Sequence, residues 1–345
     1  MIEHLGTLKG KLLSRAEARD CEEAVTRIVE TTARNFNIDQ EVYDARLQEV
    51  IQESLVNPGW FKKLLEFYDG IGPELIKPER FFRLMDKWEG LGPVWRELYL
   101  RVKEANDAEI RMQAEYGEKV REIFDLKGQK WTEKTTVPGV KNLMSREAIV
   151  LAALNTGNEG NLDALRYGKR QWSYEQIQNI VSALTTDEEK LVDNVWDLIE
   201  SLFPELAAVY ERSTGTRLKK VEGRYFPLAF DQTLSNIVDK FTIEQLNRDF
   251  YQTIYATRPP PGFVNERTGG KFDPKLRLSV IFKHISDVIH YITHAEAIRD
   301  TRKLLLDPRV RAVMQSIPEI GDKGYKEVVY WLQDLSKPKI EPVGS

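Results

Sequence analysis

The sequence predicts a mainly α-helical fold, an irregular multi-helix bundle with an extended arm rich in proline and glycine. Apolar residues recur three to four positions apart through most of the chain, which is the period of one face of an α-helix. Residues 216–275 break this period, and the stretch from Arg258 to Pro274 reads RPPPGFVNERTGGKFDP. Proline and glycine at this density do not continue a helix. We therefore expect an arm at about 216–275 that wraps the core or reaches a neighbour.

A first helical region is predicted from residue 1 to 126. Several of its helices are bounded by proline or glycine, and residues 77–79 (Lys-Pro-Glu) place a proline in the first helical turn. The last helix of the region is long and amphipathic, with heavily charged faces. The predicted helices run from about Leu8 to Phe36, Asp39 to Val56, Gly59 to Tyr68, Lys77 to Trp88 and Val94 to Phe124.

Residues 127–144 are a linker by composition, and a larger helical region follows at 145–337, before a polar tail at 338–345. The sequence NTGNEGN at 155–161 predicts a turn between helices, because asparagine and glycine supply caps and left-handed conformations. Local signals predict where helices begin: Ser145 is a helix cap, and Ser173-x-x-Gln176 and Thr186-x-x-Glu189 fit the capping-box pattern. Pro204 is predicted to interrupt the helix that Gly215 ends. Two further helices are predicted at Pro308–Ser316 and Gly324–Leu335.

Composition excludes several classes of protein. The 345 residues are 41% hydrophobic and 30% charged, as in an ordinary soluble protein, and the net charge of −4 does not by itself indicate a nucleic-acid or membrane surface. Cys21 is the single cysteine, which excludes an intramolecular disulfide. The sequence shows no signal peptide, no apolar run near the ~20 residues of a membrane span, and no common nucleotide-binding or hydrolase motif.

One predicted helix, from Leu278 to Asp307, holds three of the four histidines. A helix turns by about 100° per residue, so Asp287, His290 and His294 share one narrow face, with His284 at its edge. Imidazoles and a carboxylate one turn apart can ligate a divalent metal such as Zn²⁺ or Fe²⁺ if other elements add ligands. The simpler alternative is a polar seam that hydrogen-bonds neighbouring helices or the arm.

A basic cluster precedes the proline-rich stretch. Basic residues interleaved with aromatic ones can bind single-stranded nucleic acid through phosphate contacts and stacking. Such charge runs are more often solvated faces, so both interpretations stay open. The candidate nucleic-acid contacts are Arg217, Lys219, Lys220, Arg224 and Tyr225, and a similar set occurs at Arg166, Lys169, Arg170 and Trp172. Trp88, Trp95, Trp172, Trp196 and Trp331 are predicted to anchor the core.

Six stretches of the chain, all after residue 75, occur in the order of one region of a known family. They are RFFRLMDKWEGLGPVWRELYLRVKEANDAE (80–109), LAALNTGNEGNLDALRYGKRQWSYEQ (151–176), NVWDLIESLFPELAAVYERSTG (194–215), GRYFPLAFD (223–231), LRLSVIFKHISDVIHYITHAEAIRDTRKLLLDPRV (276–310) and YKEVVYWLQDL (325–335). As an ordered set they resemble a helical region of the large polyvalent proteins of tailed bacteriophages and prophages. In longer relatives the chain continues past the position of Leu335, so the chain resembles an N-terminal module or a short version of such a protein.

The resemblance implies a virion-associated protein or one delivered with phage DNA during DNA ejection, located in the virion or the host cytoplasm. It implies no catalytic residues. We expect a non-enzymatic phage structural or host-delivered helical module that acts through protein–protein contacts with a phage or host protein. DNA contact and homo-oligomerisation are secondary expectations, and no cofactor is expected. The alternatives are a metal-dependent hydrolase centred on Asp287, His290 and His294, and an inhibitor of a host defence protein.

Overall fold

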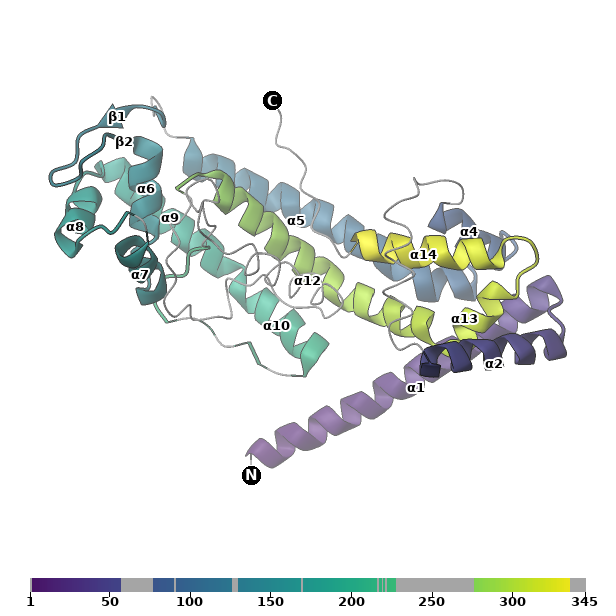
Figure 1. The fold of residues 1–345 in the computed structure, drawn as a ribbon. Coiled ribbons are helices and arrows are strands. Elements are labelled where there is room, and N and C mark those ends of the chain that lie inside the picture. The colour runs from purple at the N-terminus through teal and green to yellow at the C-terminus, as the bar shows by residue number, and fades with distance from the viewer. Residues whose placement is uncertain are drawn as a thin grey trace. The chain divides into compact units, whose positions relative to one another are not determined.

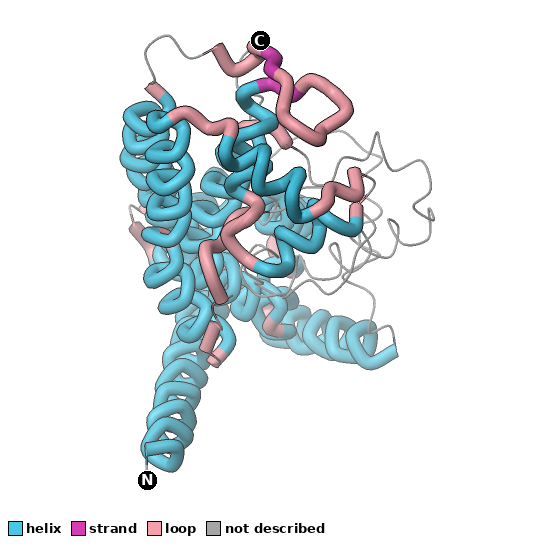
Figure 2. Tube along the Cα trace, turned by 90° about the vertical axis from the view of Figure 1, so that its left-hand side faces the viewer, coloured by secondary structure: helices cyan, strands magenta, loops and turns pink. Residues whose placement is uncertain are grey.

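The computed structural model describes most of the chain, and the described residues are mainly helical, as the sequence predicts (Figures 1 and 2). Described are residues 2–56, 77–89, 91–125, 130–168, 170–215, 217–218, 220, 222–227 and 276–335, with side chains left out for 2–15 and 54. The predicted helix at Gly59–Tyr68, most of the predicted arm and the tail at 338–345 lie outside these residues.

The helices are α1 (Ile2–Phe36), α2 (Gln40–Val56), α4 (Pro78–Met85), the π-helical segment η1 (Trp95–Leu100), α5 (Arg101–Phe124), α6 (Arg146–Leu154), α7 (Glu159–Tyr167), α8 (Tyr174–Ser182), α9 (Thr186–Ser201), α10 (Phe203–Thr214), α12 (Ser279–Leu306), α13 (Pro308–Gln315) and α14 (Gly321–Leu335). Strands among the described residues are limited to β1 (Lys134–Thr135) and β2 (Met144–Ser145), which pair antiparallel. The predicted helix at Lys77–Trp88 therefore ends at Met85, three residues early, and a turn follows.

The chain forms two compact units, each built from separated segments. The first unit combines residues 1–108 with 294–337, and the second is built mainly from 109–293. The division falls inside α5, between Ala108 and Glu109, and inside α12, between Thr293 and His294. The sequence analysis divided the chain at the polar stretch 127–144, because composition reports where a chain is polar and not which distant helices pack together.

The first unit packs α13 against α1, α2 and α14, and α4 against α14 and η1. Aromatic rings fill the space between α4, η1 and α14. The Phe82 and Trp331 ring centroids are 5.8 Å apart in an edge-on contact, and Tyr99 stacks on Trp331, also at 5.8 Å. Such aromatic pairs stabilise a core by more than the burial of their apolar surface alone.

The second unit is centred on α6, which contacts α8, α9 and β2. Six successive residues, Ile149 to Leu154, are buried, as expected for a helix that is apolar on all sides. Val137 and Met144 of the β hairpin join this core beside Ile149, Ala152 and Ile180. Val137, Val140 and Met144 of the predicted linker thus pack against the helices.

Local capping signals mostly fall where the sequence predicts. Ser145 caps α6, Ser173 and Gln176 form a capping box on α8, and Gly215 ends α10 with φ at 72°. Pro204 stands in the first turn of α10, which separates that helix from α9. The second capping box was predicted one residue too late: it consists of Thr185 and Glu188. The sequence has two consecutive threonines and two consecutive glutamates, so the capping-box pattern fits in two registers. The observed register is the one in which Glu188 is buried.

Candidate functional site

The histidine-bearing helix is α12, whose 28 residues confirm the helix predicted there. His284, His290 and His294 are all buried, with exposed fractions of 7%, 8% and 1%. Three buried imidazoles on one helix need polar partners, because a buried polar group without a hydrogen bond costs free energy.

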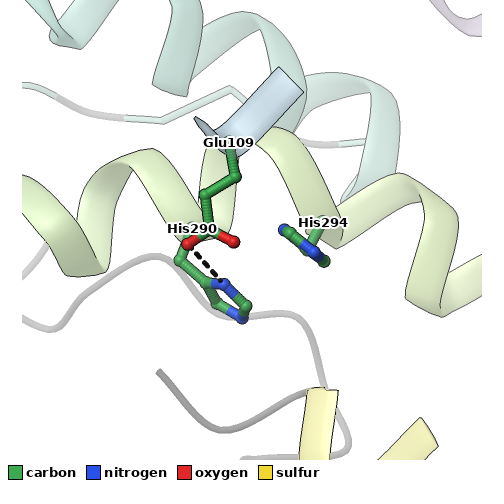
Figure 3. Close-up of side chains that lie close together, drawn as sticks. All are labelled: Glu109, His290 and His294. Carbon is green, nitrogen blue, oxygen red and sulfur yellow. Dashed lines mark hydrogen bonds and ion pairs between the residues drawn. The ribbon is translucent and has the colours of Figure 1, made fainter. Parts of the chain in front are cut away.

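The partner of His290 comes from α5. In the second unit, Nδ1 of His290 lies 3.1 Å from Oε1 of Glu109, and Figure 3 shows this carboxylate directed at the imidazole. Glu109 is itself mostly buried, with 14% of its side chain exposed. The sequence analysis missed Glu109, because the two residues are 181 positions apart and Glu109 is one acid among many on a charged helix.

The partner of His294 also comes from α5. In the first unit, Nε2 of His294 lies 3.2 Å from Oδ1 of Asn106. His290 and His294 are separated by one turn of the same continuous helix.

Asp287 and His284, which the sequence places on the same face, have other partners. Lys283, one turn earlier on α12, donates to both carboxylate oxygens of Asp287, at 2.8 and 3.1 Å. Burial raises the pKa of Asp287, and the lysine opposes that shift. The ring of His284 packs against Tyr225 with centroids 5.5 Å apart, and burial lowers the pKa of His284 to about 3.

The histidine face is described by two hydrogen-bonded pairs. Glu109 with His290, and Asn106 with His294, form polar contacts between α5 and α12. Such pairs are what the polar-seam interpretation predicts. A metal site with Asp287, His290 and His294 as ligands stays a prediction.

The predicted nucleic-acid contacts are engaged within the protein. Arg217 pairs with Glu211 at 3.5 Å, Lys220 pairs with Glu200 at 3.3 Å, and Arg224 pairs with Asp197. The ring of Tyr225 is 4% exposed, so it cannot stack on a base in this conformation. Lys219 lies outside the described residues. Ion pairs with the acids of α9 and α10 favour the solvated-face interpretation.

Residues 155–158 connect α6 to α7, as predicted, whereas residues 159–161 of the predicted turn form the first turn of α7. Asn158 caps α7 through its side chain, and Asn161 donates from Nδ2 to the carbonyl oxygen of Phe226 at 2.9 Å. A β-carbon on Gly157 would collide with the backbone oxygen of Arg224. These contacts hold segment 222–227 in place. They explain the asparagines and the glycine of this segment without a bound ligand.

One tryptophan departs from the prediction that all five anchor the core. Trp88 is 58% exposed and stands in the turn after α4, where Lys87 and Trp88 have φ angles of 52° and 62°. Two consecutive non-glycine residues in the left-handed region are uncommon. Leu91, three residues later, is 60% exposed.

A buried carboxylate holds this turn. Asp86 is 2% exposed and accepts hydrogen bonds from the backbone N–H groups of Val94, at 3.1 Å, and Trp95, at 2.8 Å. Gly92 leaves the space that this carboxylate occupies, because a β-carbon there would overlap it. We call residues 86–89, 91 and 92 the Trp88 turn. The signal that could have identified it is the Asp-Lys-Trp-Glu-Gly sequence, whose polar residues cannot continue the apolar period of α4.

No helix in the described part of the chain is long and apolar enough to cross a membrane. Comparison with known proteins adds no relative: no family model, no curated protein and no solved structure matches the chain.

Proposed function

We propose that this chain is a helical module that binds another protein, and that the Trp88 turn is a contact point. The observation behind the proposal is the exposed tryptophan in a turn with two left-handed residues. Tryptophan is among the residues most enriched in interface hot spots, where it fills a pocket of the partner. An exposed leucine three positions away supplies further apolar area for such a contact.

The energetics of the turn support a role outside the fold. A non-glycine residue in the left-handed region costs about 1 kcal/mol, so Lys87 and Trp88 together cost about 2 kcal/mol. Asp86 offsets this cost by capping the backbone of Val94 and Trp95. Burial of the Trp88 ring recovers little of this free energy, because most of the side chain stays in water. Strain that the fold does not use is typical of binding sites.

The resemblance to phage polyvalent proteins supports a setting for this activity. The partner would be a phage or host protein, met in the virion or in the host cytoplasm after DNA ejection, and inhibition of a host defence protein would use the same kind of surface. DNA contact stays secondary. A metal-dependent hydrolase centred on Asp287, His290 and His294 has less support, because both histidines are buried and a substrate needs access to the metal.

Site-specific crosslinking tests the contact. A photo-reactive amino acid at position 88 should give discrete crosslinked products in host cells or virions, identified by mass spectrometry. Position 42 is the matched control, because Val42 is also exposed, at 54%, on the regular helix α2. With the captured partner purified, Trp88→Ala should weaken binding by about 30-fold or more, as a hot-spot loss of ~2 kcal/mol implies. Equal products at both positions, or unchanged affinity of Trp88→Ala, would contradict the proposal.

The phage setting has its own test. Peptides of this chain should be detected by mass spectrometry in purified virions of a phage that encodes it, or in host cells soon after infection. Detection only in late lysate and never in virions or newly infected cells would exclude a delivered role, whatever the crosslinking shows.

A further inference from the structure

We propose that the turn between α7 and α8 binds single-stranded nucleic acid, with Tyr167 and Tyr174 stacking on bases while Arg166 and Arg170 contact phosphates. All the residues that carry this inference lie in the second unit. It goes beyond the proposed protein contact at the Trp88 turn, which lies in the first unit, so the two proposals can fail separately.

Two exposed tyrosines flank this turn. Tyr167 is the last residue of α7, Tyr174 is the first residue of α8, and each is 56% exposed. Trp172, between them, packs instead against the buried cluster that includes Met144 and Ile149. Exposed aromatic rings are surfaces on which bases of any sequence can stack, because every base has a π-face. The turn therefore offers two stacking platforms beside one buried anchor.

The backbone of the turn is held in one shape. The N–H of Trp172 donates to the carbonyl oxygen of Leu165 at 3.4 Å, which brings the start of α8 back to the end of α7. Between these helices, Gln171 is exposed and has a φ of 48°, in the left-handed region that few non-glycine residues adopt. A turn that is fixed before binding loses little conformational freedom when it binds.

Basic side chains accompany the aromatic rings. Residues 164–174 include three basic residues and no acidic one, in a chain whose net charge is −4. The guanidinium of Arg166 lies 5.0 Å from the centre of the Tyr167 ring, and that of Arg170 lies 5.5 Å from the centre of the Trp172 ring. Guanidinium groups stack on rings through their faces and carry their donors in one plane, which suits the oxygens of a phosphate.

This surface differs from the basic cluster at 217–225. There the single aromatic candidate, Tyr225, is 4% exposed, whereas both tyrosines of the α7–α8 turn reach solvent. Arg166 has an ion pair with Asp163 at 3.9 Å, and a long pair between side chains that are 35% and 38% exposed is worth little. Lys169, which the sequence analysis grouped with this set, lies outside the described residues. Of the two basic sets, the one at the α7–α8 turn therefore suits nucleic acid better.

Fluorescence anisotropy of the full chain with a labelled oligothymidine of about 15 nucleotides tests the stacking. Tyr167→Ala and Tyr174→Ala should each weaken the affinity by about 5-fold or more, as the loss of one stacked base implies. Tyr167→Phe and Tyr174→Phe keep the rings and should keep the affinity. Trp88→Ala is the matched control, because it removes a 58% exposed aromatic ring from the other unit, and it should leave the affinity unchanged. An oligouridine of the same length tells RNA from DNA.

The salt dependence of the same affinity tests the phosphate contacts. Two contacts should give a log–log slope of about −1.4, which is roughly a 7-fold loss between about 50 and 200 mM salt. The double variant Arg166→Gln/Arg170→Gln should flatten this slope, whereas Arg217→Gln, an 89% exposed arginine of the other basic set, should not. Failure to bind at about 100 µM protein, or an affinity that neither the tyrosine nor the arginine variants reduce, overturns the proposal.

The wild type gives a test that does not depend on how a variant folds. Ultraviolet crosslinking to an oligonucleotide that carries 5-iodouracil should join it to Tyr167 or Tyr174, as mapped by peptide mass spectrometry. Crosslinks confined to other residues overturn the proposal. A photo-reactive amino acid at position 174 that captures a protein in host cells, while the oligonucleotide does not bind, would assign the turn to a protein partner instead.

Discussion

The ring of Phe81 occupies the space that any side chain at position 324 would need. Gly324 lies on α14, Phe81 is fully buried on α4, and a β-carbon built on the glycine overlaps the aromatic ring. Close contact between the two helices therefore depends on a glycine within a helix, where glycine is otherwise unfavourable.

Gly324→Ala should accordingly destabilise the first unit. The added methyl must displace Phe81, and overpacking of this kind costs about 1–3 kcal/mol. The free energy of unfolding, measured by denaturant titration, should fall by that amount. Gly117→Ala is the control, because nothing lies within 4 Å of a β-carbon there, and it should raise stability by about 0.5–1 kcal/mol as α5 gains a better helix former. If both variants changed the free energy of unfolding by the same amount in the same direction, the close contact between Gly324 and Phe81 would be contradicted.

The buried carboxylate of Glu188 depends on Arg146. The guanidinium donates from Nε at 2.8 Å and makes a second contact through Nη2, while Glu188 is fully buried. Arg146→Ala removes this guanidinium from beside a buried carboxylate, which should cost about 3–5 kcal/mol. Arg121→Ala removes an exposed ion pair with Glu118 and should leave the unfolding midpoint unchanged. A small effect at both positions would show that water reaches Glu188.

Lys87→Gly tests the strain in the Trp88 turn. Glycine adopts a φ of 52° without steric cost, so the substitution should raise the free energy of unfolding by up to about 1 kcal/mol. Lys87→Val should lower it, because β-branched residues are outliers in this region. Lys103→Gly, in the regular helix α5, should lower stability by about 1 kcal/mol and so separates relief of strain from a general effect of glycine.

Burial of His284 predicts a loss of stability in acid. Its pKa falls from 6.5 to about 3 in the folded chain, so below pH 6.5 the unfolded chain takes up a proton that the folded chain refuses. This group therefore favours unfolding increasingly as pH falls from 6.5 towards 3, by at most roughly 1.4 kcal/mol per pH unit. Unfolding free energies at pH 7.5, 5.5 and 4.5 should fall less steeply in His284→Leu than in the wild type. Parallel slopes would show that His284 is protonated in the folded state.

Local signals made much of the secondary structure predictable. Ser145, Pro204 and Gly215 act on their own backbone neighbourhood, so sequence neighbours suffice to place them. The boundary at Met85 was missed because Trp88 fits the apolar period of α4 although its side chain points to water. Periodicity shows which positions are apolar and does not show which of them are covered.

The candidate site was predictable only in part. The α12 face was visible in the spacing of its histidines, since that spacing is a property of one helix. Glu109 was not, because pairing α5 with α12 is a tertiary event and α5 offers several equivalent acids. Asp287 is held by Lys283, one turn earlier on the same helix, which the histidine spacing does not reveal. Which carboxylate joins a histidine is decided by packing.

The division of the chain at Ala108 and His294 has a consequence for its synthesis on the ribosome. The first unit needs residues 294–337, so its N-terminal helices emerge long before Trp331 is available to cover Phe82 and Tyr99. Until then these aromatic faces stay open to chaperones or to aggregation. A nascent chain stopped at residue 293 contains the main segment of the second unit but lacks residues 294–337 of the first. A single cut of the chain between the units cannot yield two intact pieces.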